Sequence, residues 1–213
     1  MKGSQVECCL IRHGETRSNL EKVYAGSSRE GLTPRGEEEC RLLGRALKGR
    51  GIQRLYTSPI ERAVRTAQIL VEFLGVTPVR EDELREMGLG PWEGLSEGRV
   101  KIDYPEQWRI WNQSPAALRL DNREPLEAVQ ERILSLVRRW CDIHRGEILA
   151  AVSHVALIRC MLLYSMGRSL NEYRSLHIPN STAFFFEAHV GTSDGGLKLE
   201  LGEIVRPDRA ALA

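Results

Sequence analysis

Short apolar segments alternate with longer amphipathic ones along most of the chain. Residues 6–12 (VECCLIR), 52–58 (IQRLYTS) and 146–153 (GEILAAVS) have the length and the apolar character of buried strands. The third is apolar over nearly its whole length, which favours a central position in a sheet. Because amphipathic segments with helical spacing lie between the strands, the pattern predicts an α/β fold with a largely parallel sheet.

The residues that begin the helices are also visible in the sequence. Thr33-Pro34 combines an N-cap residue with proline at the first helical position, and Ser58-Pro59 repeats this combination before a second apolar face. We expect two further helices at about 124–144 and 155–166. Near the end of the chain, two strand-like segments predict a β-hairpin: STAFFFEAHV and GLKLELGEIV, joined by GTSDGG.

Two segments depart from this alternation. Residues 84–98 contain GLGPWEG, whose glycines and proline indicate a shaped loop rather than a regular element. Residues 99–125 are polar, hold Trp108 and Trp111, and are interrupted by prolines. We therefore expect a helical cap at about 95–125, built from one or two short helices that leave the core.

Composition narrows the classes of partner. The 213 residues include 30 basic and 29 acidic side chains, with a formal net charge of +1, so the overall field favours neither nucleic acid nor a membrane surface. The chain lacks an apolar run long enough for a membrane span, and the sequence after Lys2 does not resemble a signal peptide. The five cysteines show no CxxC spacing, which indicates reduced thiols in the cytoplasm. We expect residues 1–213 to form a single domain; the sequence leaves the oligomeric state open, with a homodimer as one alternative.

Basic and hydroxyl side chains come directly after the three main predicted strands. Arg12 and His13 follow the first, Ser58 and Arg62 follow the second, and His154 follows the third. The carboxyl ends of parallel strands share one edge of a sheet, where the ligands of α/β proteins bind. Two histidines and two arginines would repel one another there unless an anion joined them. Since guanidinium groups match phosphate with paired hydrogen bonds, the predicted ligand is a phosphoryl group.

The same residues indicate a chemistry that needs no metal and no cofactor. The histidines lack the HxH and HExxH spacings of metal ligands, and the sequence offers no acidic cluster for magnesium. A neutral imidazole nitrogen can attack phosphorus instead, which divides the transfer into two steps. Glu86, in the loop REMGLGPWEG, is the candidate to protonate the leaving oxygen and then to deprotonate water. Taken alone, each residue also has a structural explanation, such as a loop ion pair for Glu86 or a solvated helix face for Arg62.

The chain resembles the histidine phosphatase superfamily, the phosphoglycerate-mutase-like proteins, in six blocks that occur in the family's order. The blocks are LIRHGETRSN, LTPRG, YTSPIERAVRTA, LREMGLGPWEG, AVSHVALIR and IPNSTAFFFE. They span residues 8–187, which is nearly the whole chain. The resemblance implies a three-layer α/β/α sandwich with a mostly parallel mixed sheet, in which the cap at 95–125 overhangs the pocket.

The resemblance also implies a role for each candidate residue. His13 would be the nucleophile and would carry the phosphoryl group as phosphohistidine, while Glu86 would act as general acid and then as general base. The side chains that would bind the phosphate are Arg12, Arg62, His154 and Asn19.

Two positions depart from the family's pattern. Val155 follows the second histidine where glycine is common, which brings a β-branched side chain near the phosphate. The sequence REPLE (123–127) stands where the family commonly has GES at the start of the long helix. Any substrate contact from that serine is therefore absent here.

Within the family the main alternatives are a phosphatase and a mutase. The segment between Glu86 and His154 is short for a glycolytic mutase. The cap holds tryptophans and basic side chains that suit an organic leaving group of moderate size: Trp108 and Trp111 beside Lys101, Arg109 and Arg119. We expect a metal-independent phosphomonoesterase for small organic phosphate monoesters, similar to broad-specificity phosphatases and α-ribazole phosphatase. Phosphoglycerate-mutase-type transfer is the alternative, and a non-catalytic phosphate-binding module is the less favoured one.

Overall fold

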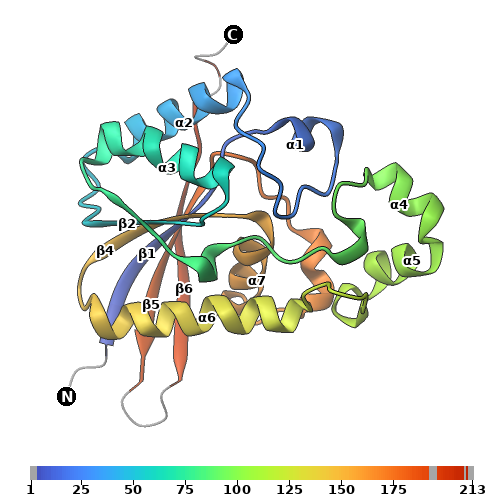
Figure 1. The fold of residues 1–213 in the computed structure, drawn as a ribbon. Helices are drawn as coiled ribbons and strands as arrows, with labels where there is room; N and C mark the ends of the chain where they lie inside the picture. Colours follow the sequence, from blue (N-terminus) through green and yellow to red (C-terminus); the bar gives the residue numbers. More distant parts are fainter. Residues whose placement is uncertain (1–3, 192–195, 209, 211–213) are drawn as a thin grey trace.

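A six-stranded mixed sheet forms the centre of the protein, and helices cover both of its faces (Figure 1). The computed structural model describes residues 4–191, 196–208 and 210. The strands are β1 (Ser4–Arg12), β2 (Arg54–Thr57), β3 (Pro78–Arg80), β4 (Ile148–Ser153), β5 (Ala183–Val190) and β6 (Leu197–Val205). Across the sheet they are ordered β3-β2-β4-β1-β5-β6, and only β5 runs against its neighbours. The predicted mostly parallel mixed sheet is confirmed, with β4 in a central position.

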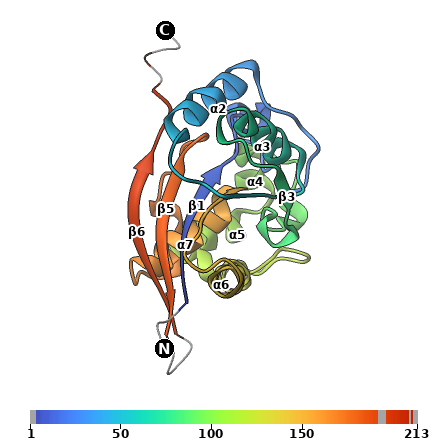
Figure 2. The same cartoon turned by 90° about the vertical axis from the view of Figure 1, so that its left-hand side faces the viewer.

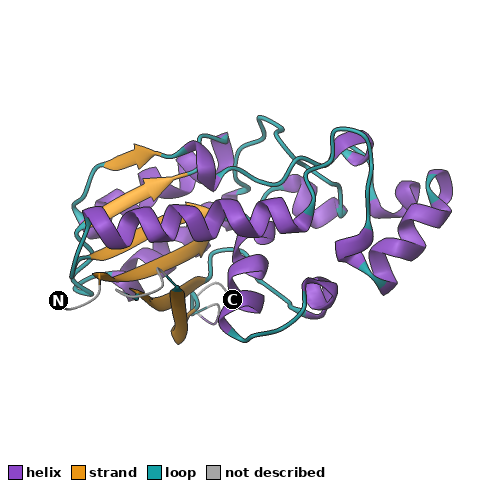
Figure 3. Ribbon diagram, turned by 90° about the horizontal axis from the view of Figure 1, so that it is seen from below, coloured by secondary structure: helices purple, strands orange, loops and turns teal. Residues whose placement is uncertain are grey.

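Four long helices complete the three layers. They are α2 (Pro34–Leu47), α3 (Glu61–Leu74), α6 (Leu126–Ile143) and α7 (Val155–Ser165). Figures 1 and 2 show α2 and α3 on one face of the sheet and α6 on the other, and Figure 3 shows α6 lying over the strands. The shorter helices are α1 (Arg17–Glu21), α4 (Glu97–Asp103), α5 (Pro105–Gln113), η1 (Asp82–Leu84), η2 (Gly90–Trp92), η3 (Pro115–Ala117) and η4 (Leu170–Ser175).

The side chains of β1 show why the sheet is covered on both faces. Cys8 and Leu10 pack in one core cluster with α6 and α7, whereas Cys9 and Ile11 pack in the other with α2 and α3. Successive side chains of a strand point to opposite faces. A strand whose two faces are both buried therefore has a nearly continuous apolar sequence, and β1 is such a strand.

The helix starts follow the sequence signals, with one correction. Thr33 caps α2 through its hydroxyl, as predicted. The helix after Ser58-Pro59 begins only at Glu61, with Ile60 as its N-cap residue, so the prediction that Ser58 caps this helix is wrong. The Ser58 hydroxyl instead accepts a hydrogen bond from the N–H of Ile60 at 3.2 Å, in a turn that precedes the helix. This turn leaves the Ser58 side chain directed toward the end of β4.

Helices α4 and α5 lie within residues 95–125, the segment called the cap below. They stand at the right of Figure 1 and contact the core through Val100 and Trp111. Strands β5 and β6 pair antiparallel, while residues 192–195 of the expected GTSDGG turn lie outside the described residues. In the part of the chain that the structure describes, no helix has the length and apolar character of a membrane span.

Candidate active site

The loop after β1 holds His13 in one tautomer. Its Nδ1 atom lies 2.8 Å from the carbonyl oxygen of Gly14. A carbonyl oxygen only accepts hydrogen bonds, so Nδ1 carries the proton and Nε2 keeps its lone pair. The Nε–H group of Arg62 donates to that Nε2 at 3.2 Å. This imidazole, only 3% exposed, therefore presents an unprotonated nitrogen at a fixed point.

Close packing of α2 fixes the position of this loop. The N–H of Gly14 donates to Thr66 Oγ1 on α3 at 3.0 Å. A Cβ atom at Gly14 would lie 2.7 Å from Cys40 Sγ, and one at Gly36 would lie 2.3 Å from the Glu15 carbonyl oxygen. Both distances are shorter than real Cβ contacts, so α2 can approach the loop only because neither position has a side chain.

Two arginines lie beside His13 and direct most of their hydrogen bonds at backbone carbonyls. Arg62, on α3 and 2% exposed, donates to the carbonyl oxygens of Gly26 at 2.7 Å and Ser28 at 3.4 Å. Arg12, at the end of β1, donates to the Ile178 carbonyl, and its Nε is buried without a hydrogen-bond partner among the described residues. Neither guanidinium forms an ion pair in the described part of the chain. Their positive charges therefore remain available to an anionic ligand.

The second histidine arrives from β4. His154 is fully buried and is the N-cap residue of α7. Its ring centroid lies 5.1 Å from that of His13, and its Nε2 lies 2.7 Å from Ser58 Oγ. The Nδ1 atom is buried without a partner among the described residues. The ends of β1, β2 and β4 therefore bring their polar residues together, as the sequence predicts.

Asn180, which sequence reasoning missed, ties this loop to the segment before β5. Its Nδ2 lies 3.0 Å from the His13 carbonyl oxygen, 3.2 Å from that of Gly14 and 2.8 Å from Asn19 Oδ1. Asn19 Oδ1 also accepts from the Thr16 N–H at 3.2 Å, so the amide oxygen of Asn19 holds the loop. Asn180 could have been found only from the pairing of β5 with β1. Because the two strands are antiparallel, the residues just before β5 lie beside the end of β1.

Glu86 lies on the loop between η1 and η2. It lines the same pocket as His13 and Arg62, and its Oε1 accepts from the N–H of Met87 at 2.9 Å. The side chain is half-buried. A carboxyl group at this point faces the same space as the unprotonated nitrogen of His13.

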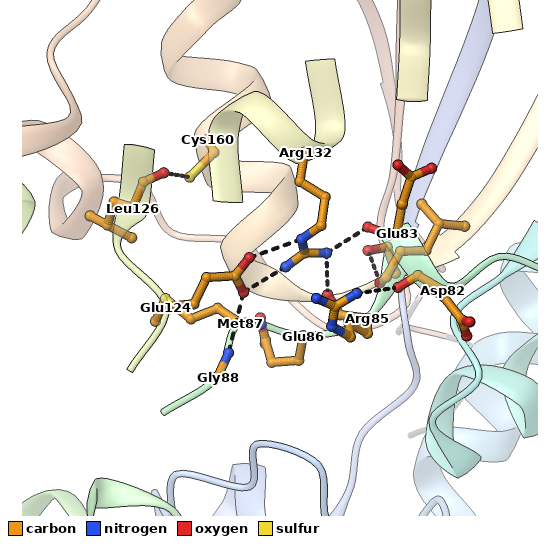
Figure 4. Close-up of polar contacts among 12 residues, drawn as sticks. Asp82, Glu83, Arg85, Glu86, Met87, Gly88, Glu124, Leu126, Arg132 and Cys160 are labelled. Carbon is orange, nitrogen blue, oxygen red and sulfur yellow. Dashed lines mark hydrogen bonds and ion pairs between the residues drawn. The ribbon is translucent and has the colours of Figure 1, made fainter. Parts of the chain in front are cut away.

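Arg132 of α6 fastens this loop (Figure 4). It donates to both carboxylate oxygens of Glu124, at 2.9 and 2.8 Å, and to the carbonyl oxygens of Glu83 at 2.6 Å and Arg85 at 3.0 Å. Glu124 in turn accepts from the N–H of Gly88 at 3.4 Å. The Arg132–Glu124 pair therefore holds the loop on both sides of the candidate acid.

These side chains open into a pocket of about 520 Å³. The candidate residues that line it are Arg12, His13, Asn19, Arg62 and Glu86. His154 is buried against His13. Val155 also lines the pocket, so the residue that departs from the family pattern does lie at the site. It begins α7 with helical backbone geometry and needs no positive φ.

The cap residues that line the pocket are not all the expected ones. Of the cap's residues, Glu97 and Trp111 line the pocket, whereas Lys101, Arg109 and Arg119, the basic residues expected to suit the leaving group, do not. Those three pair with nearby acids: Lys101 with Glu97 at 2.9 Å, Arg109 with Glu106 at 3.3 Å and Arg119 with Glu127 at 3.4 Å. The basic residues that line the pocket besides Arg12 and Arg62 are Lys22, Arg159, Arg174 and His177.

Burial and neighbouring cations keep both histidines neutral. Desolvation, followed by the charges of Arg62 and Arg12, lowers the pKa of His13 well below its usual value near 6.5. Desolvation and Arg62 do the same to the pKa of His154. Burial also lowers the pKa of Arg12 to about 10, which leaves this guanidinium charged at neutral pH. The site thus combines neutral imidazoles with charged guanidiniums.

Comparison with known proteins gives the site a family. Residues 8–193 match the sequence model of the histidine phosphatase superfamily (branch 1). The chain is 27% identical to phosphoserine phosphatase 1 of Hydrogenobacter thermophilus over 177 residues, 83% of this chain and 84% of that protein. It is 30% identical to the 2,3-bisphosphoglycerate-dependent phosphoglycerate mutase of Nitrosococcus oceani over 210 residues, 84% of this chain and 88% of that protein. The solved structure of Bacillus stearothermophilus YhfR matches with a TM-score of 0.82 at 25% identity, covering 92% of this chain and 96% of that one. The chain belongs to the histidine phosphatase superfamily.

Proposed function

We propose that the protein is a metal-independent phosphomonoesterase in which His13 forms a phosphohistidine intermediate. The tautomer of His13 carries this proposal, since Nδ1 donates to a carbonyl oxygen and Nε2 keeps its lone pair beside Arg62. An imidazole held in this state can attack phosphorus without first losing a proton. A phosphatase among the relatives supports hydrolysis as the reaction.

The reaction has two balanced steps. In the first, the Nε2 lone pair of His13 attacks phosphorus, the bond to the ester oxygen breaks, and the Glu86 carboxyl gives that oxygen a proton. In the second, a water oxygen attacks phosphorus while the Glu86 carboxylate takes a proton from it. The P–N bond then breaks, the electron pair returns to Nε2, and inorganic phosphate leaves.

Four side chains offer donors to the phosphoryl oxygens: Arg12, Arg62, His154 and Asn19. The Nε of Arg12 and the Nδ1 of His154 are buried without partners in the described part of the chain, which supports this role. A Ser58 hydroxyl that donates to Nε2 of His154 would place the ring proton on Nδ1, where it can reach the ligand. The fixed charges would stabilise the transition state, because phosphoryl transfer redistributes charge over the same oxygens.

Transfer to a second organic acceptor, as in a mutase, is the second candidate function. The 30% identical relative named as a phosphoglycerate mutase favours it. Hydrolysis is better supported by the phosphoserine phosphatase relative and by the short segment between Glu86 and His154. For the compartment, we propose the cytoplasm, since all five cysteines are free thiols.

The test is phosphate release in EDTA from p-nitrophenyl phosphate, 3-phosphoglycerate and α-ribazole phosphate, with His13→Ala as the control. We expect release that survives EDTA, disappears in the variant and is accompanied by an acid-labile phosphoenzyme. Isomerisation of 3-phosphoglycerate without phosphate release would replace the phosphatase with a mutase. Absence of both turnover and phosphoenzyme would indicate a phosphate-binding module, and full activity of His13→Ala would refute the mechanism.

A further inference from the structure

The pocket carries more positive charge than a phosphoryl group requires. Arg12 and Arg62 lie beside His13, at the reacting end. Arg159 of α7 and Arg174 of η4 also line the pocket. In the described part of the chain, neither of these two arginines forms an ion pair with a carboxylate. Two unpaired guanidinium groups therefore face the space that the leaving group would occupy.

Both of these arginines are held in place by aromatic rings rather than by acids. The guanidinium carbon of Arg159 lies 4.8 Å from the ring centroid of Tyr173, and its Nε donates to the Leu176 carbonyl at 2.9 Å. The guanidinium carbon of Arg174 lies 4.9 Å from the ring centroid of Trp108 and 5.8 Å from that of Trp111. Stacking of this kind orients a guanidinium while leaving its N–H groups able to bind an oxyanion.

A buried cation lies on the Trp111 wall of the pocket. Arg123 is 8% exposed, and its guanidinium carbon lies 4.5 Å from the ring centroid of Trp111 and 4.9 Å from that of Trp92. Its NH1 and NH2 atoms are buried without hydrogen-bond partners among the described residues. Its charge adds to the positive potential around Trp111, and it is weakly screened because the group is buried.

The acidic residues that line the same pocket are fewer than its cations: Glu15, Glu86 and Glu97 against Arg12, Lys22, Arg62, Arg159 and Arg174. Glu97 pairs with Lys101 at 2.9 Å, and Glu15 accepts a hydrogen bond from the Thr33 hydroxyl at 2.9 Å. The third lining acid, Glu86, is the proposed proton donor. The hydroxyl of Tyr173, whose pKa is raised by burial, stays protonated and remains a donor. The leaving-group end of the pocket is therefore suited to an anion.

We propose that the substrate is a phosphomonoester whose leaving group carries a second anionic group, of the carboxylate class, which Arg159 and Arg174 bind. This inference rests on the proposed phosphatase function and adds a substrate class to it. A neutral leaving group would leave both guanidiniums without a counter-charge, and a cationic one would be repelled. Lys101, Arg109 and Arg119 of the cap pair with acids instead and do not line the pocket.

Matched pairs of esters test the second anion directly. 3-Phosphoglycerate and glycerol 3-phosphate differ only in a carboxylate against a hydroxymethyl group. Phosphoserine and phosphoethanolamine differ only in the presence of the carboxylate. Binding of all four to the His13→Ala protein, measured by calorimetry, needs no turnover. Because hydrogen bonds between charged groups are stronger than neutral ones, the carboxylate should tighten binding roughly tenfold or more in each pair.

Single substitutions show which residues bind the carboxylate. In the His13→Ala background, Arg159→Gln and Arg174→Gln should each lower the carboxylate preference several-fold, and Arg174→Lys should restore part of it. Arg109→Gln is the matched control, because Arg109 is an exposed arginine of the cap that pairs with Glu106 away from the pocket. Equal affinity for the members of each pair would overturn the inference, as would a preference unchanged in both glutamine variants.

The two proposals fail in different experiments. Absence of turnover and of phosphoenzyme in the unmodified protein would end the proposed function. The calorimetric ratio would still decide whether a second anionic group is bound.

Discussion

Replacement of Arg132 by methionine perturbs the candidate acid without touching the pocket. Arg132 makes two hydrogen bonds to the Glu124 carboxylate and two to backbone carbonyls of the loop that carries Glu86. The side chains of Arg132 and Glu124 are 10% and 19% exposed. Removing one partner of a fully buried ion pair costs about 3–5 kcal/mol, because the other charge stays buried. The remaining exposure lowers the expected loss of folding stability to about 2–4 kcal/mol.

The kinetic consequence distinguishes positioning from simple destabilisation. An alkoxide leaving group needs the proton of Glu86, whereas p-nitrophenolate leaves without much help. We therefore expect kcat/KM of Arg132→Met to fall about tenfold or more for an alkyl phosphate such as 3-phosphoglycerate, and much less for p-nitrophenyl phosphate. Arg132→Lys should recover part of the loss by restoring a charge opposite Glu124.

Arg138→Met provides the matched control on the same helix. Arg138 pairs with Glu131 at 3.2 Å, and these side chains are 36% and 67% exposed. An exposed pair contributes roughly 0–1 kcal/mol, so urea unfolding and both kinetic constants should change little. Equal losses with the alkyl and the aryl ester in Arg132→Met would refute the positioning role, since a general effect on folding cannot discriminate between leaving groups.

Three further outcomes follow from the site. Ser58→Ala should destabilise the fold by about 1–3 kcal/mol and weaken phosphate binding, because Nε2 of His154 loses its partner; thermal shifts with and without inorganic phosphate measure both. His13 and His154 have pKa values below that of unfolded histidine, so the unfolded chain binds more protons below about pH 6.5 and stability falls there. Together the two histidines should lower the free energy of unfolding by about 2 kcal/mol between pH 7.0 and 5.5. Urea unfolding of the protein and of the double variant His13→Asn/His154→Asn at both pH values measures this loss. An identical pH dependence of stability in the two proteins would contradict the assignment. Gly36→Ala should reduce stability by about 1–3 kcal/mol and lower kcat, since its Cβ would meet the Glu15 carbonyl at 2.3 Å; normal stability by urea unfolding together with normal kcat would show that the loop can yield.

The strand ends were predictable because topology alone brings them together. Parallel neighbours place their carboxyl ends at one edge, and β1, β2 and β4 are such neighbours. His13 and His154 therefore meet once the strands are identified. Ser58 was expected nearby but as a helix cap. Its contact with His154 depends on a turn two residues long, which the cap-and-proline pattern does not distinguish from a helix start.

The remaining residues of the site depend on long-range pairing that local pattern does not encode. Asn180 reaches the His13 loop because β5 pairs antiparallel with β1, and a hairpin prediction does not say which strand its first member joins. Arg159 and Arg174 come from α7 and η4, where arginine at helical spacing is ordinarily a solvated residue. Lys101 and Arg109 of the cap were expected at the site but do not line the pocket. Acids three or four positions away on the same helix pair with them instead.

One arrangement of charge serves both binding and chemistry at this site. In the proposed function Arg12 and Arg62 bind the phosphoryl dianion, and the same charges, added to burial, lower the pKa of His13 so that its Nε2 stays unprotonated. A carboxylate in direct hydrogen-bond contact with the imidazole would raise that pKa and would also pair with the guanidiniums. The structure meets this requirement by giving the arginines carbonyl partners, those of Ile178 for Arg12 and Gly26 for Arg62. Dipolar partners orient a guanidinium without cancelling its charge, so the nucleophile and the anion site can coexist a few ångströms apart.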